Sequence, residues 1–165
     1  MLVNILEKIE NFDQLKTEVL ELIDKVGFEK NQIICQGLAS DPLDWHTGIG
    51  RIEELEDRRE REYSVLNPAL NGTYLARIIE KYQGFRTRIM SMTPRQCYSI
   101  HYDPTPRIHI PIITNSQAWM VWPFHNECHR MPTGNIYWTD TTKPHTFING
   151  HTENRIHIVI GVKND

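Results

Sequence analysis

Two histidines, one aspartate and one arginine in the second half of the chain have the types and spacing for metal chemistry. His101 and Asp103 are separated by one residue, His145 follows, and Arg155 comes ten residues later. Two histidines and one carboxylate can hold Fe(II) on one face and leave three coordination positions open. An arginine can bind the distal carboxylate of a 2-oxo acid chelated at those positions. The pattern therefore suggests an iron oxygenase as a hypothesis.

The spacing of His101 and Asp103 allows both side chains to bind one ion, although a His-x-Asp motif alone is weak evidence for a metal site. In a strand, residues i and i+2 point to the same side, so His101 and Asp103 can contact one ion together. With eight His and eight Asp in the chain, a His-x-Asp pair arises by chance roughly 0.4 times. The donors suit Fe(II), Mn(II) or Zn(II). The alternative is a surface His/Asp pair and an unrelated histidine.

A second group of possible metal ligands lies at residues 125–129, His-Asn-Glu-Cys-His. Cysteine and histidine can bind zinc. This spacing matches no common zinc module, and no second Cys/His pair lies nearby. We therefore interpret these residues as a strand edge or loop.

The composition bounds the class of protein. A chain of 165 residues, 39% hydrophobic and 24% charged, is typical of one soluble domain. The net charge of −3 gives no indication of a basic surface that would bind nucleic acid. Three scattered cysteines favour a reducing compartment over a disulfide framework. We read no signal peptide and no membrane span, so the expected location is the cytoplasm.

The first half of the chain reads as a helical lead-in and support, residues 1–85, within a single domain, residues 1–165. Apolar spacing predicts a helix capped by Asp13 and ended by Gly27, and a second helix over residues 73–82. A short strand is expected at residues 32–38. The charge-dense segment 51–62 is interpreted as a solvated helix or mobile segment, with a lid over the site as the alternative.

Short strands separated by turn residues dominate from residue 86 onward. We expect a mainly β (α+β) fold in which residues 86–165 form a jelly-roll, cupin-like β-helix core. The expected strands are residues 86–92, 96–102, 107–114, 118–122, 127–130, 135–139, 145–149 and 155–162. Two of them begin with the same tetrapeptide, Arg-Ile-His-Ile, at residues 107–110 and 155–158. In each, Arg and His share one face, which either meets solvent or lines a polar cavity.

Two stretches of this second half resemble a known family. Residues 101–111, His-Tyr-Asp-Pro-Thr-Pro-Arg-Ile-His-Ile-Pro, resemble the core of the aspartyl/asparaginyl β-hydroxylase family of 2-oxoglutarate oxygenases. Residues 134–140, then His145, Asn149 and Arg155, are similar to the second half of that family. The resemblance covers roughly residues 84–162, while the N-terminal half matches only as a generic helical lead-in.

The resemblance implies a double-stranded β-helix that uses Fe(II), 2-oxoglutarate and O2. It implies iron at His101, Asp103 and His145, with Arg155 on the 5-carboxylate of 2-oxoglutarate. Arg107 and His109 would lie by its 1-carboxylate end. The animal enzymes of the family carry glycine in place of Asp103, so a peptidyl Asp/Asn substrate does not follow from the resemblance.

The leading hypothesis is a hydroxylase of an amino acid, or of an Asp/Asn/Pro-like side chain in a peptide, releasing succinate and CO2. Its partner would be a small-molecule amino acid or a peptide or protein substrate, with no nucleic acid and no membrane. One alternative is a cupin-like metal-dependent isomerase or lyase, and another is a non-enzymatic jelly roll that binds a small acid. Tyr98 or Tyr102 could donate a hydrogen bond into the site, and Arg130 could bind substrate or form a surface ion pair. Trp119, Trp122, Trp138 and Tyr137 are expected in the core.

Overall fold

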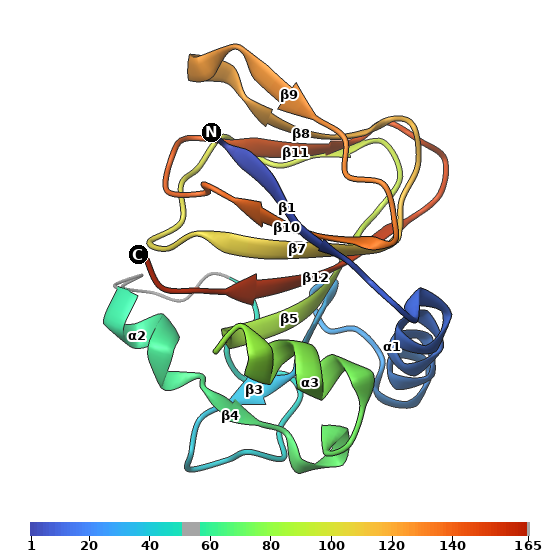
Figure 1. The fold of residues 1–165 in the computed structure, drawn as a ribbon, viewed down its shortest axis with the longest axis vertical. Helices are drawn as coiled ribbons and strands as arrows, with labels where there is room; N and C mark the ends of the chain where they lie inside the picture. The colour runs from blue at the N-terminus through green and yellow to red at the C-terminus, as the bar shows by residue number, and fades with distance from the viewer. Residues whose placement is uncertain (51–56, 165) are drawn as a thin grey trace.

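The computed structural model describes residues 1–50 and 57–164 as two packed β-sheets with helices on one side (Figure 1). The larger sheet has the strand order β1-β10-β7-β12-β5-β2, with bounds Val3–Lys8, Asn135–Thr139, Arg107–Ile113, Arg155–Gly161, Phe85–Met92 and Gln32–Ile34. The smaller sheet has the order β6-β11-β8-β9, with bounds Gln96–Cys97, Thr146–Asn149, Ala118–Trp122 and Glu127–His129. The expected mainly β, jelly-roll architecture is confirmed.

The remaining elements are short or helical. The helices are α1, α2 and α3, with bounds Phe12–Val26, Asp57–Glu62 and Tyr74–Lys81. A small two-stranded sheet pairs β3 with β4, Gln36–Gly37 and Val65–Leu66, and two 3-10 turns, η1 and η2, span Pro68–Leu70 and Pro123–His125. No helix of the described part of the chain is long and apolar enough to cross a membrane. Its three cysteines are free.

The predicted strands match the observed ones closely. The bounds of β8 and β10 agree fully, and β5, β7, β9, β11 and β12 differ from expectation by one residue at one end. The expected strand 96–102 is interrupted, because only Gln96–Cys97 is regular and His101 forms an isolated bridge. The sequence reasoning missed β1, which pairs with β10, and so the N-terminal half supplies both edge strands of the larger sheet.

The two main helices begin and end close to the predicted positions. Asn11, not the expected Asp13, caps α1, because its side chain accepts a hydrogen bond from the Gln14 backbone at 3.1 Å. Gly27 ends α1 at a φ of 78°, a conformation that glycine adopts without strain. Thr73 caps α3 through the Ala76 backbone amide. These local hydrogen bonds explain why both helices were predictable.

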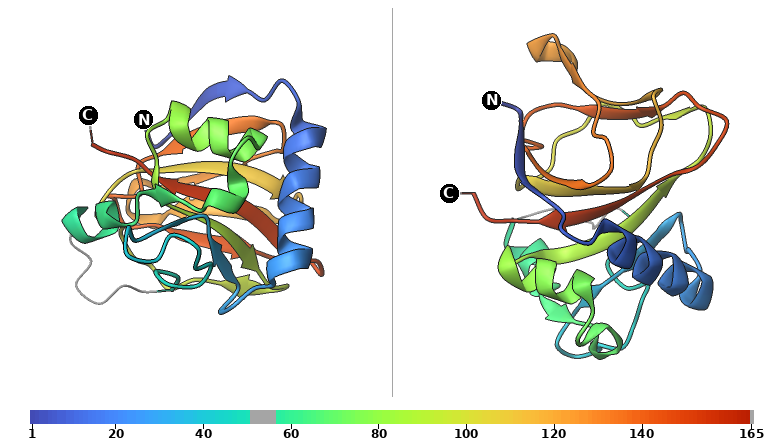
Figure 2. Two further views of the ribbon diagram at one scale, coloured as in Figure 1. Left: turned by 90° about the horizontal axis from the view of Figure 1, so that it is seen from below. Right: turned by 45° about the vertical axis from the view of Figure 1, so that its right-hand side comes forward.

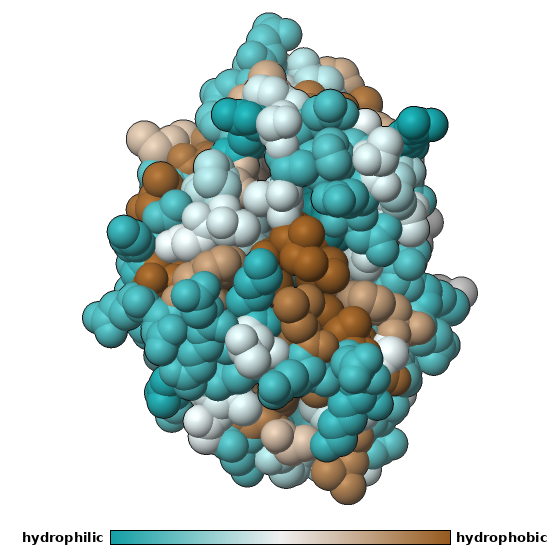
Figure 3. Space-filling view, turned by 90° about the vertical axis from the view of Figure 1, so that its right-hand side faces the viewer, coloured by the Kyte–Doolittle hydropathy of each residue, from teal (hydrophilic) through white to brown (hydrophobic). Residues whose placement is uncertain are grey.

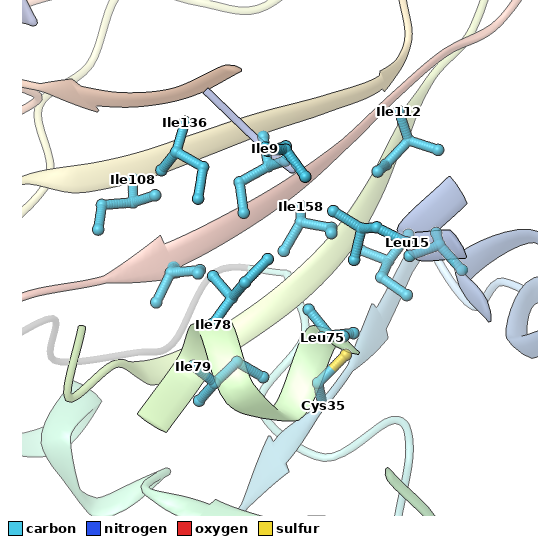
Figure 4. Close-up of a cluster of buried hydrophobic side chains, with 14 of the residues drawn as sticks. Ile9, Leu15, Cys35, Leu75, Ile78, Ile79, Ile108, Ile112, Ile136 and Ile158 are labelled. Carbon is cyan, nitrogen blue, oxygen red and sulfur yellow. The ribbon is translucent and has the colours of Figure 1, made fainter. Parts of the chain in front are cut away.

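Helices α1 and α3 lie on one side of the larger sheet (Figures 1 and 2), and the main cluster of buried apolar side chains joins these helices to that sheet. Figure 4 shows part of this cluster, in which isoleucines of the sheet meet apolar side chains of α1 and α3. A smaller apolar cluster between the two sheets includes Met92, Met120, Trp122, Tyr137 and Phe147. The expectation of buried aromatics holds for Trp122 and Tyr137, whereas Trp119 and Trp138 are half-buried. Seen from the α1 side, the surface is mostly hydrophilic around one apolar area (Figure 3).

The charge-dense segment 51–62 lies partly outside the described residues, which begin again at residue 57. From there the chain forms α2. The expectation of a solvated helix is wrong at Glu60, whose side chain is fully buried, because two buried arginines, Arg86 and Arg107, pair with its carboxylate. α2 is therefore attached to the larger sheet by charge and not by apolar anchors.

Replacing Ile158 by alanine tests the core between sheet and helices. Ile158 is 0% exposed in the central strand β12, so Ile158→Ala should lower the free energy of unfolding by about 2–5 kcal/mol. The matched control is Ile5→Ala on the edge strand β1, where the side chain is 64% exposed and the expected loss is below about 1 kcal/mol. Urea unfolding of both variants measures this, and equal losses would contradict the assigned core.

Candidate metal centre

An isolated pair of backbone hydrogen bonds places the two predicted histidine ligands opposite each other. The His101 amide donates to the His145 carbonyl at 3.0 Å, and the His145 amide donates to the His101 carbonyl at 2.8 Å. Residues paired in this way face the same side of a ladder. Their ring centroids are accordingly 4.5 Å apart.

Asp103 completes a group of three donor atoms. Two residues after His101, its carboxylate lies on the same side, with Oδ2 at 4.0 Å from Nε2 of His145. One ligand atom from each of the three residues lies within 4.8 Å of the others. Among the residues that the structure describes, no other group of three His, Cys, Asp or Glu side chains is arranged in this way. The three predicted ligands therefore come together as one possible metal site.

Both histidines have one ring nitrogen committed to the backbone. Nδ1 of His101 lies 2.8 Å from the Ser99 carbonyl oxygen, and Nδ1 of His145 lies 2.9 Å from that of Lys143. A carbonyl oxygen only accepts, so each Nδ1 carries the proton and each Nε2 keeps a lone pair for a metal. Burial lowers the pKa of His145, which favours the neutral form that binds metal.

Opposing effects act on the Asp103 carboxylate. Burial by itself would raise its pKa, but the nearby charges of Arg107, His145 and Arg88 outweigh burial and lower it. Nε of Arg107 lies 3.3 Å from Oδ2 of Asp103. Asp103 is therefore ionised under ordinary conditions and can act as an anionic ligand.

Arg107 is buried behind the three ligands. Its Nη2 donates to both carboxylate oxygens of Glu60, at 2.8 and 2.9 Å, and its Nη1 donates to Thr105. These contacts already use the donors that a carboxylate of a 2-oxo acid would need. The role of Arg107 beside the 1-carboxylate stays a sequence-based expectation, and the contacts seen here favour a role toward Asp103.

Arg155 is a buried cation with an aromatic neighbour. Its guanidinium lies 3.4 Å from the centre of the Phe147 ring, and Nη1 lies 3.9 Å from Sδ of Met92. No carboxylate of the described residues pairs with it, and Nε has no hydrogen-bond partner there. Burial lowers its pKa to about 9. An unpaired buried charge is costly, so this guanidinium is suited to receive an anion.

His109 and His157 share the inner face of the larger sheet with Arg155. The Nδ1 of His109 and both ring nitrogens of His157 are buried without hydrogen-bond partners among the described residues. Burial, followed by the charge of Arg155, keeps the pKa of both well below the ordinary histidine value. Both rings are therefore neutral, and His109, which lines the cavity, can donate a hydrogen bond to a ligand there.

These side chains surround a cavity of about 660 Å³. The lining includes the three candidate ligands, His109 and Arg155, together with Arg86, Arg88, Met90, Tyr98, Tyr102, Met120 and Phe147. Arg88 is only 7% exposed, and among the described residues its hydrogen bond goes to the neutral Gln32 at 3.2 Å. Burial lowers the pKa of Arg88 to about 9. The cavity therefore has a second buried arginine without a carboxylate partner among the described residues.

The structure also places the tyrosines, Arg130 and the segment 125–129 that the sequence analysis considered. Tyr98 and Tyr102 both line the cavity, but Tyr98 is half-buried whereas Tyr102 is mostly exposed, so Tyr98 is the better donor into the site. Arg130 stacks on the ring of Trp119 at 5.5 Å. In the segment 125–129, His129 contacts Glu127 at 2.9 Å while Cys128 is exposed, and no metal group forms among these described residues.

Sequence reasoning missed three residues of this site. Glu60 was interpreted as part of a solvated charge run, and Phe147 was not singled out within the expected strand 145–149. The cavity position of Arg88 could have been inferred from the sequence. Arg86 and Arg88 are two residues apart on a predicted strand, so they share a face of it, together with two methionines at positions 90 and 92. A strand with two arginines on its buried face indicates a polar cavity or a ligand.

The sequence matches the family model for aspartyl/asparaginyl beta-hydroxylase over residues 55–165. No curated protein matches it.

Among solved structures, the chain is similar to a viral collagen prolyl hydroxylase from Paramecium bursaria Chlorella virus-1, solved in complex with 2-oxoglutarate. The TM-score is 0.50 at 17% identity, covering 99% of this chain and 97% of that one. A cupin domain from Bordetella pertussis Tohama I matches with a TM-score of 0.42 and 15% identity, over 49% of this chain and 83% of that one. The expectation of a hydroxylase is confirmed by the family match, which covers two thirds of the sequence: the chain belongs to the aspartyl/asparaginyl beta-hydroxylase family.

Proposed function

We propose that the chain is an Fe(II)- and 2-oxoglutarate-dependent hydroxylase of an amino acid or of an amino-acid side chain in a peptide. The observation that carries this proposal is that one cavity holds a group of two histidines and one carboxylate together with a buried arginine that has no carboxylate partner among the described residues. The donor set suits Fe(II). Family membership and the likeness to a 2-oxoglutarate-dependent hydroxylase support the same reading.

The roles of the individual side chains follow from their contacts. His101, Asp103 and His145 would hold the metal, with the two rings oriented by the Ser99 and Lys143 carbonyls. When bound, Fe(II) with 2-oxoglutarate and O2 would supply the chemistry to hydroxylate an unactivated C–H bond: one oxygen atom of O2 would enter the substrate and the other succinate, with release of CO2.

Arg155 would bind the distal carboxylate of 2-oxoglutarate. Phe147 covers one face of the guanidinium and excludes water from it, which strengthens a charge-assisted pair. Neutral His109 would donate a hydrogen bond to the proximal carboxylate, because it lines the same cavity and its Nδ1 has no partner among the described residues. An isomerase, a lyase or a plain acid-binding module would not need this combination of ligands and arginine.

Arg88 provides a reason to expect an acidic prime substrate. In register, Arg155 lies opposite Met92 and Arg88 lies opposite Val159, four residues further along β12. That spacing corresponds to roughly 13 Å along the strands, so the two guanidinium groups begin from opposite ends of the cavity. Arg88 is close enough to Asp103 to lower its pKa. We therefore assign Arg88 to a carboxylate of the prime substrate and Arg155 to 2-oxoglutarate.

One prediction concerns the cofactor pair, Fe(II) and 2-oxoglutarate. Anaerobic addition of Fe(II) and 2-oxoglutarate to the metal-free protein should produce the weak visible charge-transfer band of the chelate. Arg155→Ala should weaken 2-oxoglutarate binding by about 2–5 kcal/mol, because it removes a buried charge partner, and Arg155→Lys should restore only part of the loss. Spectrophotometric titration gives the dissociation constants.

The matched control is Arg130→Ala, which removes an exposed arginine stacked on Trp119 and should leave the titration unchanged. No band in the wild type, with metal nevertheless bound, would reject the oxygenase in favour of the isomerase or lyase class. A band that Arg155→Ala leaves intact would reject the assigned role of Arg155.

A further prediction concerns the carboxylate of the prime substrate. In the protein loaded with Zn(II), which cannot turn over, and with 2-oxoglutarate, calorimetric titration with free amino acids should find at least one that binds. Its α-carboxamide should bind at least about tenfold more weakly, because a hydrogen bond to a charged group contributes about 1.5–3 kcal/mol. Arg88→Gln should weaken binding of the acid similarly and leave 2-oxoglutarate binding within about threefold of the wild type.

Equal binding of acid and amide would contradict the assignment of Arg88, and so would an Arg88→Gln variant that binds the acid as well as the wild type does. Loss of 2-oxoglutarate binding in Arg88→Gln would instead show that the two arginines have their roles exchanged.

A further inference from the structure

Glu60 is a fully buried carboxylate that the proposed chemistry does not use. It lies on α2 and pairs with arginines of two strands, with Oε1 at 2.6 Å from Nη1 of Arg86 and 2.8 Å from Nη2 of Arg107. Its side chain is 0% exposed, although it belongs to a helix with six charged residues. Burial of a charge in this way needs a compensating arrangement around it.

The contacts of Glu60 determine which part of Arg107 faces the metal centre. Nη2 of Arg107 is held by both oxygens of Glu60, and Nη1 by the Thr105 hydroxyl. Only Nε is left toward Asp103, at 3.3 Å and without a hydrogen bond. Arg107 thus attracts the Asp103 carboxylate without closing a two-pronged hydrogen-bonded pair on it.

We propose that Glu60 is a positioning residue for the metal centre: by holding the Nη edge of Arg107, it keeps the Asp103 carboxylate free to bind the ion. This inference rests on the proposed metal centre at His101, Asp103 and His145. The chain of contacts runs from α2 through β7 to the ligand, and every distance in it is at most 3.3 Å.

A direct pair between Arg107 and Asp103 would weaken metal binding, and Glu60 opposes the formation of that pair. Without the charge of Glu60, Nη2 of Arg107 can turn to Asp103 and form the bidentate pair that guanidinium and carboxylate groups prefer. That pair would compete with the metal for the same oxygens. Partners of metal ligands change metal affinity by about 10–100-fold when they are replaced, and we expect a loss in that range for Glu60→Gln.

The experiment is a titration of the metal-free protein with Co(II) alone, followed by its visible absorption and by calorimetry. Glu60→Gln should bind Co(II) about 10–100-fold more weakly, with a changed absorption spectrum. Glu62→Gln, on the same helix but exposed, should match the wild type. Arg86→Met also breaks an ion pair of Glu60 but leaves Arg107 held, so its Co(II) affinity should stay within about threefold of the wild type.

The double variant Glu60→Gln/Arg107→Met tests the route through Arg107. When Arg107→Met is already present, Glu60→Gln should change Co(II) affinity by less than about twofold, because the competing guanidinium is gone. Thermal unfolding of each apo variant separates loss of fold from loss of metal binding.

Three results would overturn the inference. They are an unchanged Co(II) affinity in Glu60→Gln, an equal loss in Arg86→Met, and an undiminished effect of Glu60→Gln in the Arg107→Met background. A wild type that binds no Co(II) would reject the proposed metal centre itself, and the role of Glu60 with it. The two failures are therefore distinguishable from the wild-type titration alone.

Discussion

Alternation along β7 and β12 is the constraint on which both the core and the candidate site depend. Successive side chains of a strand point to opposite faces, so the isoleucines of the two Arg-Ile-His-Ile tetrapeptides pack toward α1 and α3. The arginines and histidines are thereby directed into the space between the sheets. A one-residue slip of either strand would bury charge against the helices and remove the cavity lining at once.

Antiparallel pairing of these two strands makes the two ends of the cavity different. Arg107 lies opposite Gly161, whereas Arg155 lies opposite Met92 at the other end of β12. Identical tetrapeptides on neighbouring strands therefore send their arginines to opposite ends. Arg107 contacts Asp103 and Glu60, whereas Arg155 contacts Phe147 and Met92 and has no carboxylate partner among the described residues. The arginine of one tetrapeptide is thus paired with carboxylates, and the arginine of the other is not.

The charges around the cavity fall into a paired group and an unpaired group. Arg86 and Arg107 share Glu60, and Arg107 also faces Asp103. Arg88 and Arg155 have no carboxylate partner among the described residues. Binding of a divalent ion and doubly charged 2-oxoglutarate adds no net charge, so an excess of positive charge remains beside the metal. Buried excess charge is costly, and an anionic substrate would offset it.

Apart from the interrupted segment 96–102, the strands of the second half and the faces of their residues could be predicted from the sequence, because alternation and turn residues act over a few positions. The sequence also predicted His101, Asp103 and His145 as ligands and Arg155 as a cofactor-binding residue, and the structure brings these side chains to one cavity. The sequence could not determine β1, whose exposed Ile5 and Leu6 hide the alternation and which is joined to β10 by backbone hydrogen bonds.

The burial and pairing of Glu60 and Arg88 depend on tertiary contacts. Glu60 stands in a charge run that resembles a solvated helix, and its partners Arg86 and Arg107 lie 26 and 47 residues away. A charge is buried or solvated according to what approaches it from distant parts of the chain. That long-range pairing is not encoded in local spacing, and so it appeared only once the sheets and α2 were in place.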